Sequence, residues 1–269
     1  MDMFGSLNFV FGKRPFEDSG ECSDEIVFTF DNGKKLYVSQ NFLCYASPVF
    51  KERFQKRYGD TENKDIEMKE NSSDFLELLL SLHPGVQKPI DKSNVLGVVS
   101  VAEEYKIESV INRCKDVMNE WLTSEVRTAG TETISNVDKA NHAKTCLTIM
   151  IKAISLGYKE VVSRAIEVLA EFGHDVYTGS LIKPAVQKPL NTFGTSKANK
   201  KLSSKKPAAV NVGIPKTQVD YSFFTFTPKN LISEGPVNEC KRMFDSLSEQ
   251  MKARLHLQRL KLCDDGNMI

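Results

Sequence analysis

The side chains most able to do chemistry in this chain are its histidines and cysteines, and their spacing argues against a metal site. The four histidines show no H-x-x-x-H spacing, which is the separation that puts two metal ligands on one face of a helix. The six cysteines lie far apart and form no C-x-x-C pair, so we expect reduced thiols in a cytoplasmic or nuclear protein. We therefore expect no metal and no disulfide framework.

Sequence motifs of nucleophilic or nucleotide chemistry are equally missing. There is no G-x-S-x-G nucleophile elbow, no Walker loop and no G-x-G-x-x-G dinucleotide fingerprint. The Gly33-Lys34-Lys35 run is typical of a hairpin turn, and adjacent acids such as Glu103-Glu104 point to different sides of a helix. We therefore expect no catalytic residue and no cofactor, and we predict that the protein is not an enzyme.

Length and charge narrow the class of partner. At 269 residues the chain has room for one large domain or two modest ones. Its 36 basic and 35 acidic residues leave a net charge of +1, so there is no global field to attract nucleic acid or an anionic membrane. No run approaches the roughly 18 apolar residues of a membrane span, and residues 1–4 lack the basic start of a secretory signal. We expect proteins, rather than membranes or nucleic acid, as its partners.

The stretch from residue 24 to about residue 183 alternates strand and helix patterns and is predicted to be folded. Apolar residues alternate over 26–30, and strand character resumes at 36–38. Between them, Asp31-Asn32-Gly33 supplies residues that tolerate a positive φ. This pattern predicts a β-hairpin.

Helical patterns dominate after the hairpin. We predict a short helix over about 40–46, a second helix that begins at Ser47-Pro48, and a brief strand over 65–68. Apolar stripes at helical spacing complete the folded part: 75–82 with Asp74 as its cap, 95–102, 110–121, and the pair 147–154 and 161–172 on either side of Gly157. For 95–102 a strand is the competing prediction, because its valines and Gly97 lower helix propensity. The mixture indicates an α+β domain.

The sequence changes character near residue 183. Residues 183–219 contain eight lysines and no acidic residue, a composition typical of a disordered linker. A nuclear localisation signal is one interpretation of its lysine cluster, and a common lysine-rich linker is the other; the cluster is Lys197, Lys200, Lys201, Lys205 and Lys206. Residues 220–269 combine an aromatic run with a short amphipathic helical pattern. For that segment three alternatives stay open: docking on its own domain, binding a partner, or a solvated tail.

Three stretches of the folded part resemble the BTB/POZ domain family. LYVSQNFLCYASPVF at 36–50 carries the Ser-Pro-x-Phe signature of the family at 47–50. DIEMKENSSDFLELLLSLHP at 65–84 and VLGVVSVAEEYKI at 95–107 match the strand and helices that follow, in the same order. Ser39 stands where many members have His, as in an invertebrate-type variant of the domain.

The resemblance implies an α+β fold in which a hairpin and a short sheet pack on a helical cluster, followed by a helical extension and a mostly disordered tail. The expected division is an N-terminal arm at 1–23, the BTB/POZ domain at 24–123, the helical extension at 124–183, a basic disordered linker at 184–219, and an aromatic segment with a C-terminal amphipathic helix at 220–269. The arm is expected to cover a sheet edge, in the manner of a swapped segment, or else to be disordered.

The resemblance also implies an interaction module. BTB domains dimerise, and many are substrate adaptors of cullin-RING ubiquitin ligases, so we expect a homodimer that binds a cullin scaffold and an unknown protein substrate. The helical pair at 144–172 resembles the extension that lengthens the cullin-binding surface of such adaptors. The candidate residues are Tyr58, Asp60 and Phe54 for cullin binding, and Phe42, Leu43 and Phe50 for the dimer interface.

Two alternatives accompany this implication. Asp60 is one methylene shorter than the Glu of the family's cullin-binding element, which weakens the match at this element. The competing interpretation is that Tyr58 only closes its loop and binds no cullin. For the whole protein, the competing interpretation is a self-associating scaffold or transcriptional regulator that binds no cullin.

Overall fold

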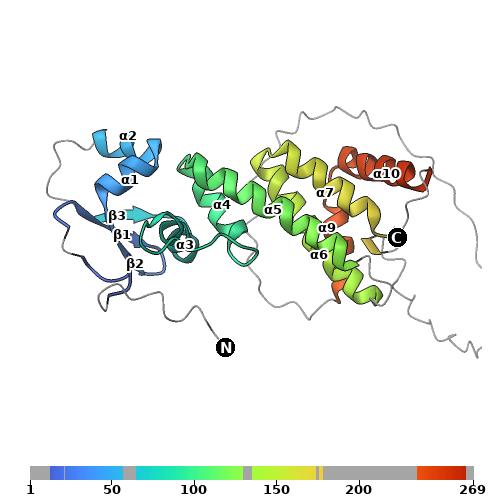
Figure 1. Ribbon diagram of the computed structural model, residues 1–269, viewed down its shortest axis with the longest axis horizontal. Helices are drawn as coiled ribbons and strands as arrows, with labels where there is room; N and C mark the ends of the chain where they lie inside the picture. Colours follow the sequence, from blue (N-terminus) through green and yellow to red (C-terminus); the bar gives the residue numbers. More distant parts are fainter. Residues whose placement is uncertain are drawn as a thin grey trace, which may run out of the picture. The chain divides into compact units, whose positions relative to one another are not determined.

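The computed structural model describes residues 13–20, 22–56, 65–129, 135–173, 176–177 and 235–264. These residues belong to one compact unit, which joins the segment that begins at Gly235 to the part of the chain that ends at Leu181. A small sheet packed on helices gives the α+β fold that the sequence predicts (Figure 1).

The sheet within the described residues has three strands in the order β2-β1-β3. β1 (Glu25–Phe30) and β2 (Lys35–Ser39) form the predicted antiparallel hairpin, and β3 (Asp65–Met68) pairs in parallel with β1. Gly33 makes the turn with φ of 76°, a conformation that a residue with a side chain rarely adopts. Alternate residues of each strand are buried, because successive side chains point to opposite faces of a sheet.

The first helix, α1 (Gln40–Ala46), is held at its start by a capping arrangement. The Ser39 hydroxyl accepts a hydrogen bond from the Phe42 N–H at 3.2 Å and donates one to Asp24 Oδ2 at 2.6 Å. The same carboxylate oxygen accepts the Asn41 N–H at 3.0 Å. The hydrogen bond from Ser39, followed by that from Asn41, lowers the pKa of Asp24. Ser39, where many family members have His, therefore has a local role in starting α1.

The second helix, α2 (Pro48–Lys56), begins at the predicted Ser-Pro pair. The Ser47 hydroxyl accepts the Phe50 N–H at 3.2 Å and donates to the Tyr105 carbonyl oxygen at 2.6 Å. Ser47 is 1% exposed, so both bonds are shielded from water. The serine thus starts α2 and also ties it to a residue 58 positions along the chain.

The third helix, α3 (Ser72–Leu82), is capped by Asn71 and not by Asp74, which corrects the predicted cap. The Asn71 side chain accepts two N–H groups of the first turn, at 2.9 and 3.2 Å. Asp74 lies inside that turn and faces Gly97 of α4 (Val95–Glu104), where an added Cβ would lie 2.2 Å from Asp74 Oδ1. The helix prediction for α4 is confirmed, and the glycine permits this close approach.

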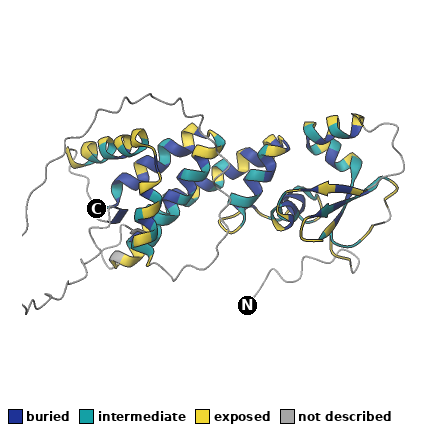
Figure 2. Ribbon diagram, turned by 180° about the vertical axis from the view of Figure 1, so that it is seen from behind, coloured by how far each residue is buried: buried dark blue, intermediate teal, exposed yellow. Residues whose placement is uncertain are grey.

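Aromatic rings fill the core between the sheet and these helices. Phe50 stacks on Tyr105 with ring centroids 4.1 Å apart, and on Phe54 at 5.7 Å. Phe28 of β1 stacks on Phe50 at 5.7 Å, and Phe75 of α3 meets Phe50 edge-on at 6.3 Å. Figure 2 shows the buried faces of the helices and strands turned toward one another. One ring of α2 therefore joins the sheet, α3 and the end of α4.

A helical extension follows the small sheet and its helices. α5 (Glu108–Ala129) precedes the predicted helical pair, which consists of α6 (Asn136–Leu156) and α7 (Lys159–Glu171). Gly157 ends α6 in the left-handed conformation, with φ of 74°. α6 begins before residue 144, where the sequence pattern places the start of the helical pair. The apolar pattern does not reveal this earlier start, because most residues of the first turns of α6 are polar.

The C-terminal segment forms two helices rather than the single helix expected. α9 (Pro236–Asp245) and α10 (Glu249–Asp264) are separated by a turn at 246–248, and Leu247 within it is buried. α9 packs against α6, and α10 packs against α7. Residues 235–264 of this segment are therefore docked on their own chain, which is the first of the three alternatives. None of the described helices combines the length and hydropathy that a bilayer span requires.

Candidate protein-interaction surfaces

The three residues proposed for the dimer interface differ in their exposure. Leu43 is 1% exposed and Phe50 0%, so both belong to the core of their own chain. Phe42 is half-buried and packs against Phe16, with ring centroids 6.1 Å apart. Of the three, Phe42 alone has surface to offer a second copy, and its role there remains a prediction.

Tyr45 is the exposed aromatic residue of α1 that the sequence reasoning missed. Its side chain is 97% exposed, whereas Leu43, two positions earlier, is buried. Two residues along a helix correspond to about 200°, so the burial of Leu43 puts Tyr45 on the outer side. The helical period was the signal that would have identified it. An aromatic ring fully in water on a short helix marks this side of α1 as a candidate interface.

The end of the N-terminal arm lies on the outer side of the hairpin. The Phe16 carbonyl oxygen accepts the Tyr37 N–H of β2 at 2.8 Å, and its ring meets His83 edge-on at 5.4 Å. Residues 13–18 thus cover part of the β2 edge of their own chain. The apolar residues of the arm before residue 13 lie outside the described residues.

The residues proposed for cullin binding fall into two groups. Phe54 is 4% exposed and stacked on Phe50, so its ring is part of the core and is not available to a partner. Its assignment as a cullin contact is therefore corrected: the helical period of α2 turns it inward beside Phe50. Tyr58 and Asp60 follow the end of α2 and lie outside the described residues.

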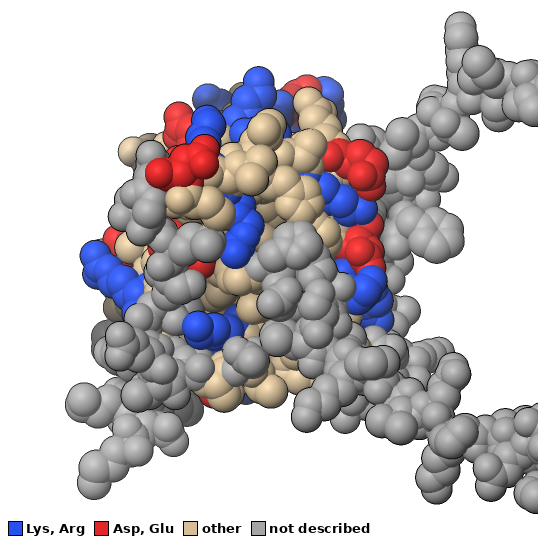
Figure 3. Space-filling view, turned by 90° about the vertical axis from the view of Figure 1, so that its right-hand side faces the viewer, with Lys and Arg blue, Asp and Glu red and all other residues tan. Residues whose placement is uncertain are grey.

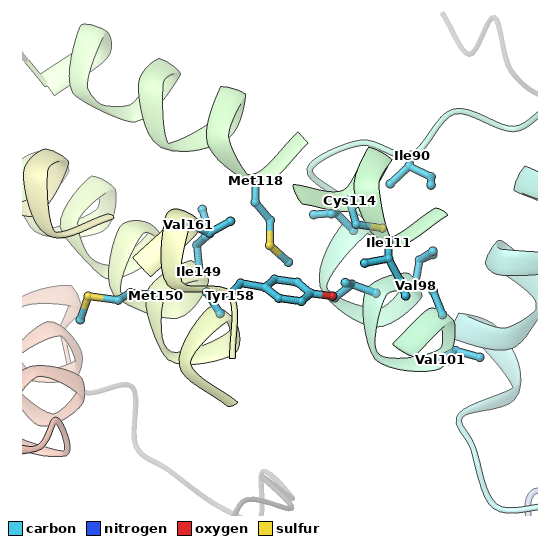
Figure 4. Packing of buried hydrophobic residues seen from close by; sticks show 14 of the residues in the cluster. Ile90, Val98, Val101, Ile111, Cys114, Met118, Ile149, Met150, Tyr158 and Val161 are labelled. Carbon is cyan, nitrogen blue, oxygen red and sulfur yellow. The ribbon is translucent and has the colours of Figure 1, made fainter. Parts of the chain in front are cut away.

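The extension is attached to the preceding helices by polar contacts across a buried junction. Tyr158, at the start of α7, donates its hydroxyl to Glu103 of α4, and Lys152 of α6 donates to Ser100 of α4. Lys115 of α5 lies over the Tyr158 ring, 4.4 Å from its centroid. Figure 4 shows the Tyr158 hydroxyl pointing toward the helices that carry the core residues beside it. Contacts with α4 and α5 thus hold the tyrosine at the start of α7, and Lys152 joins α6 to α4.

A second polar cluster joins the end of α5 to α6. Glu125 accepts the Trp121 indole N–H at 2.7 Å and contacts the His142 ring. Lys92, in the loop before α4, lies 3.8 Å from the same carboxylate and 6.0 Å from the Trp121 ring centroid. One carboxylate therefore connects the loop, α5 and α6.

Two deeply buried thiols stay protonated in the part of the chain that the structure describes. No group of three or more His, Cys, Asp or Glu side chains there is arranged to hold a metal ion. Burial raises the pKa of Cys114 to about 12 and that of Cys240 to about 12, so both thiols are protonated at neutral pH. The lysine cluster and the aromatic run of the linker and tail fall outside the described residues.

Comparison with known proteins identifies the first part of the chain. The family model of the BTB/POZ domain matches residues 15–121. BTB and MATH domain-containing protein 38 of Caenorhabditis elegans is 31% identical over 85 residues, which is 31% of this chain. The match spans only 22% of the length of that relative, so the likeness concerns the domain and not the whole protein.

Proposed function

Because residues 15–121 of this chain are a BTB/POZ domain, a protein-interaction domain, we propose that the protein is a homodimeric adaptor that links a protein substrate to a cullin-RING ubiquitin ligase. The observation that carries the proposal is the fixed attachment of α6 and α7 to α4 and α5. An extension held in this way lengthens the surface that a BTB domain offers to a cullin. A freely moving extension would lose conformational entropy on binding, which would weaken the complex.

Self-association through the α1 side is supported by Tyr45 and Phe42. The fully exposed Tyr45 and the half-buried Phe42 together form a rigid apolar surface with one polar end. Aromatic residues such as tyrosine often contribute most of the binding energy of an interface. On this proposal, Leu43 and Phe50 act only indirectly, by holding α1 and α2 in place.

Cullin binding is proposed for Tyr58 and Asp60, with Tyr58 as the apolar anchor and Asp60 as the charge. Both lie in sequence between α2 and β3, directly after the helix that the Ser-Pro pair begins. Phe54 is no longer proposed as a cullin contact, since its ring is buried in the core beneath α2.

The test is binding of the full chain to a cullin N-terminal domain, measured by calorimetry. We expect micromolar or tighter binding, and its loss in the Tyr58→Ala/Asp60→Lys double variant. Asp31→Lys, an equal charge reversal at the exposed hairpin turn, is the matched control and should bind as the wild type does. If the intact protein is dimeric by light scattering but binds no cullin, the adaptor proposal is wrong and the self-associating scaffold replaces it.

A further inference from the structure

The last two helices of the described chain, α9 and α10, pack on the extension through a small set of apolar side chains. The main contacts of α9 are with α6, and those of α10 are with α7. The Phe244 ring meets the fully buried Tyr177 ring, with centroids 4.9 Å apart. The buried side chains of this segment are Cys240, Phe244, Leu247 and Leu255. We call residues 236–264 the C-terminal cover, and the side of α6 and α7 on which they pack the covered face.

The cover lies on α6 in a defined register. Glu239 Oε2 of α9 accepts a hydrogen bond from Lys144 Nζ of α6 at 3.0 Å, and Met243 Sδ lies 4.0 Å from Thr148 Oγ1. Both pairs are 95 positions apart in sequence, and about one helical turn separates them, so α9 runs parallel to α6. A charge pair and a sulfur contact, one turn apart, thus fix how the cover is placed.

Arg259 of α10 fastens the other half of the cover. Its guanidinium donates to the carbonyl oxygen of Ala170 at 3.3 Å and to that of Phe172. These carbonyls lie at the end of α7, where the helix itself has no further N–H groups to pair with them. Hydrogen bonds from a charged donor are stronger than neutral ones. Arg259 is therefore a strong polar attachment of α10.

The rest of the extension has attachments of its own that do not involve the cover. His142 of α6 contacts Glu125 of α5, and Tyr158 at the start of α7 donates to Glu103 of α4. Residues 178–234 separate the cover in sequence from the helices beneath it, and a chain of that length spans up to roughly 190 Å. The cover can therefore leave the covered face as a unit. It stays tethered and competes there at a high local concentration.

We propose that the C-terminal cover is an internal ligand, which fills and thereby blocks a binding site for an amphipathic helix of another protein. The partner helix has the pattern of the cover: an acidic residue opposite Lys144, followed by apolar residues at helical spacing. In the cover these apolar residues are Cys240, Met243, Phe244 and Leu247.

Two other ways of choosing a partner are less well supported. Figure 3 shows acidic and basic side chains intermixed on the side of the molecule that carries α10, so the charge of the outer surface selects no partner. A second copy of the chain brings a cover that is already docked on its own α6 and α7. The selective surface is therefore the covered face, and the cover itself defines what fits it.

This inference goes beyond the adaptor function and does not rest on it, since no cullin takes part. For an adaptor, the covered face would be a place to hold a protein that displaces the cover. Failure of cullin binding would leave the covered face untouched, and failure of the internal ligand would leave cullin binding untouched.

The thiol of Cys240 reports whether the cover opens. Cys240 and Cys114 of α5 are both fully buried with a pKa of about 12, so a thiol reagent attacks either one only after exposure. In the native full chain, we expect iodoacetamide to alkylate Cys240 at least tenfold faster than Cys114, as measured by mass spectrometry. Arg259→Met should accelerate Cys240 at least a further tenfold and leave Cys114 unchanged. Lys261→Met, at an exposed position of the same helix, is the matched control and should change neither rate.

A ligand added in trans shows whether the covered face binds a helix. The probe is a fluorescent peptide of residues 235–264, and its binding to the full chain is measured by anisotropy. It should bind the Arg259→Met chain at least tenfold more tightly than the wild type, because it competes there with a weakened cover. A peptide with Phe244→Glu should bind at least tenfold more weakly. Lys144→Glu in the Arg259→Met chain should shift the preference to a peptide with Glu239→Lys.

Three results would overturn the proposal. Equal alkylation rates of Cys240 and Cys114 would make the cover part of one cooperative core. Equal binding of the peptide to the wild-type and Arg259→Met chains, or to neither, would show that the covered face takes no ligand. A lower mass of the Arg259→Met chain by light scattering would show that the cover joins two copies. If Arg259→Met also exposes Cys114, Glu239→Lys at the partly exposed charge pair replaces it, and the same comparisons decide.

Discussion

Removal of one hydroxyl at the junction of the extension should have an effect that depends on pH. Tyr158 is 7% exposed and donates its hydroxyl to Glu103, while Lys115 lies over its ring. Tyr158→Phe keeps the ring and its contact with Lys115 but deletes the donor. The variant therefore isolates the hydrogen bond between α7 and α4 from the packing around it.

The size of the effect at neutral pH follows from the partner of the hydroxyl. A hydrogen bond to a charged group contributes about 1.5–3 kcal/mol to stability. Glu103 is half-buried, so water can replace part of the lost contact, and the lower end of the range applies. We expect Tyr158→Phe to lower the free energy of unfolding by about 1.5 kcal/mol at pH 8.

At alkaline pH this difference should disappear. Burial, and then the hydrogen bond to Glu103, raise the pKa of Tyr158 well above its ordinary value of 10.0. Above pH 10 the unfolded chain has released this proton while the folded protein keeps it, so the unfolded state is favoured as pH rises. The wild type loses about 1.4 kcal/mol per pH unit through this group, and the phenylalanine variant loses nothing. Near pH 11 the two proteins should be about equally stable.

Urea denaturation followed by circular dichroism at pH 8 and pH 11 measures both quantities. Groups other than Tyr158 titrate equally in the two proteins and cancel in the difference between them. Ser23→Ala, which removes a hydroxyl at an exposed position before β1, is the control and should change stability by less than about 0.5 kcal/mol at pH 8. The same loss of stability in Tyr158→Phe at both pH values would refute the role assigned to the hydroxyl.

Three further substitutions test the packing. Ser47→Ala should cost about 2 kcal/mol in thermal unfolding, because α2 loses its cap and the Tyr105 carbonyl oxygen loses its donor; an effect below about 0.5 kcal/mol would contradict this. Gly97→Ala should cost about 1–3 kcal/mol by pushing its Cβ into Asp74, and adding Asp74→Ala should recover part of that loss; simple additivity of the two would argue against the contact. Leu255→Ala should cost about 2–5 kcal/mol and expose α10 to trypsin in limited proteolysis, and an unchanged cleavage pattern would show that α10 is not held by this residue.

Features set by residues near one another in the chain were predictable. The hairpin turn at Gly33 and the start of α2 at Ser47 follow from turn and capping rules that involve only a few neighbouring residues. The same rules mistook Asp74 for the cap of α3, because Asn71 and Asp74 are both good caps and lie three residues apart. The break between α9 and α10 was missed because the apolar spacing continues across Leu247.

The candidate interaction residues were predicted less well than the fold. Leu43, Phe50 and Phe54 were selected as apolar residues near a family signature, and all three are in the core. Tyr45 was overlooked, although the helical period and a buried Leu43 point to its exposure. Apolar residues are identified by type, whereas their availability to a partner depends on what the rest of the chain covers.

The sequence by itself determined the family of the domain, the order of its strands and helices, and the absence of known catalytic motifs, because these depend on residue type and on spacing along the chain. Only the tertiary structure decided which side of each helix is covered. The contact between Tyr158 and Glu103 joins residues 55 positions apart, and Leu257 and Leu260 of α10 are exposed because α7 covers the opposite side of that helix. Periodicity gives the separation of residues around a helix, but burial depends on the distant segment that packs against it.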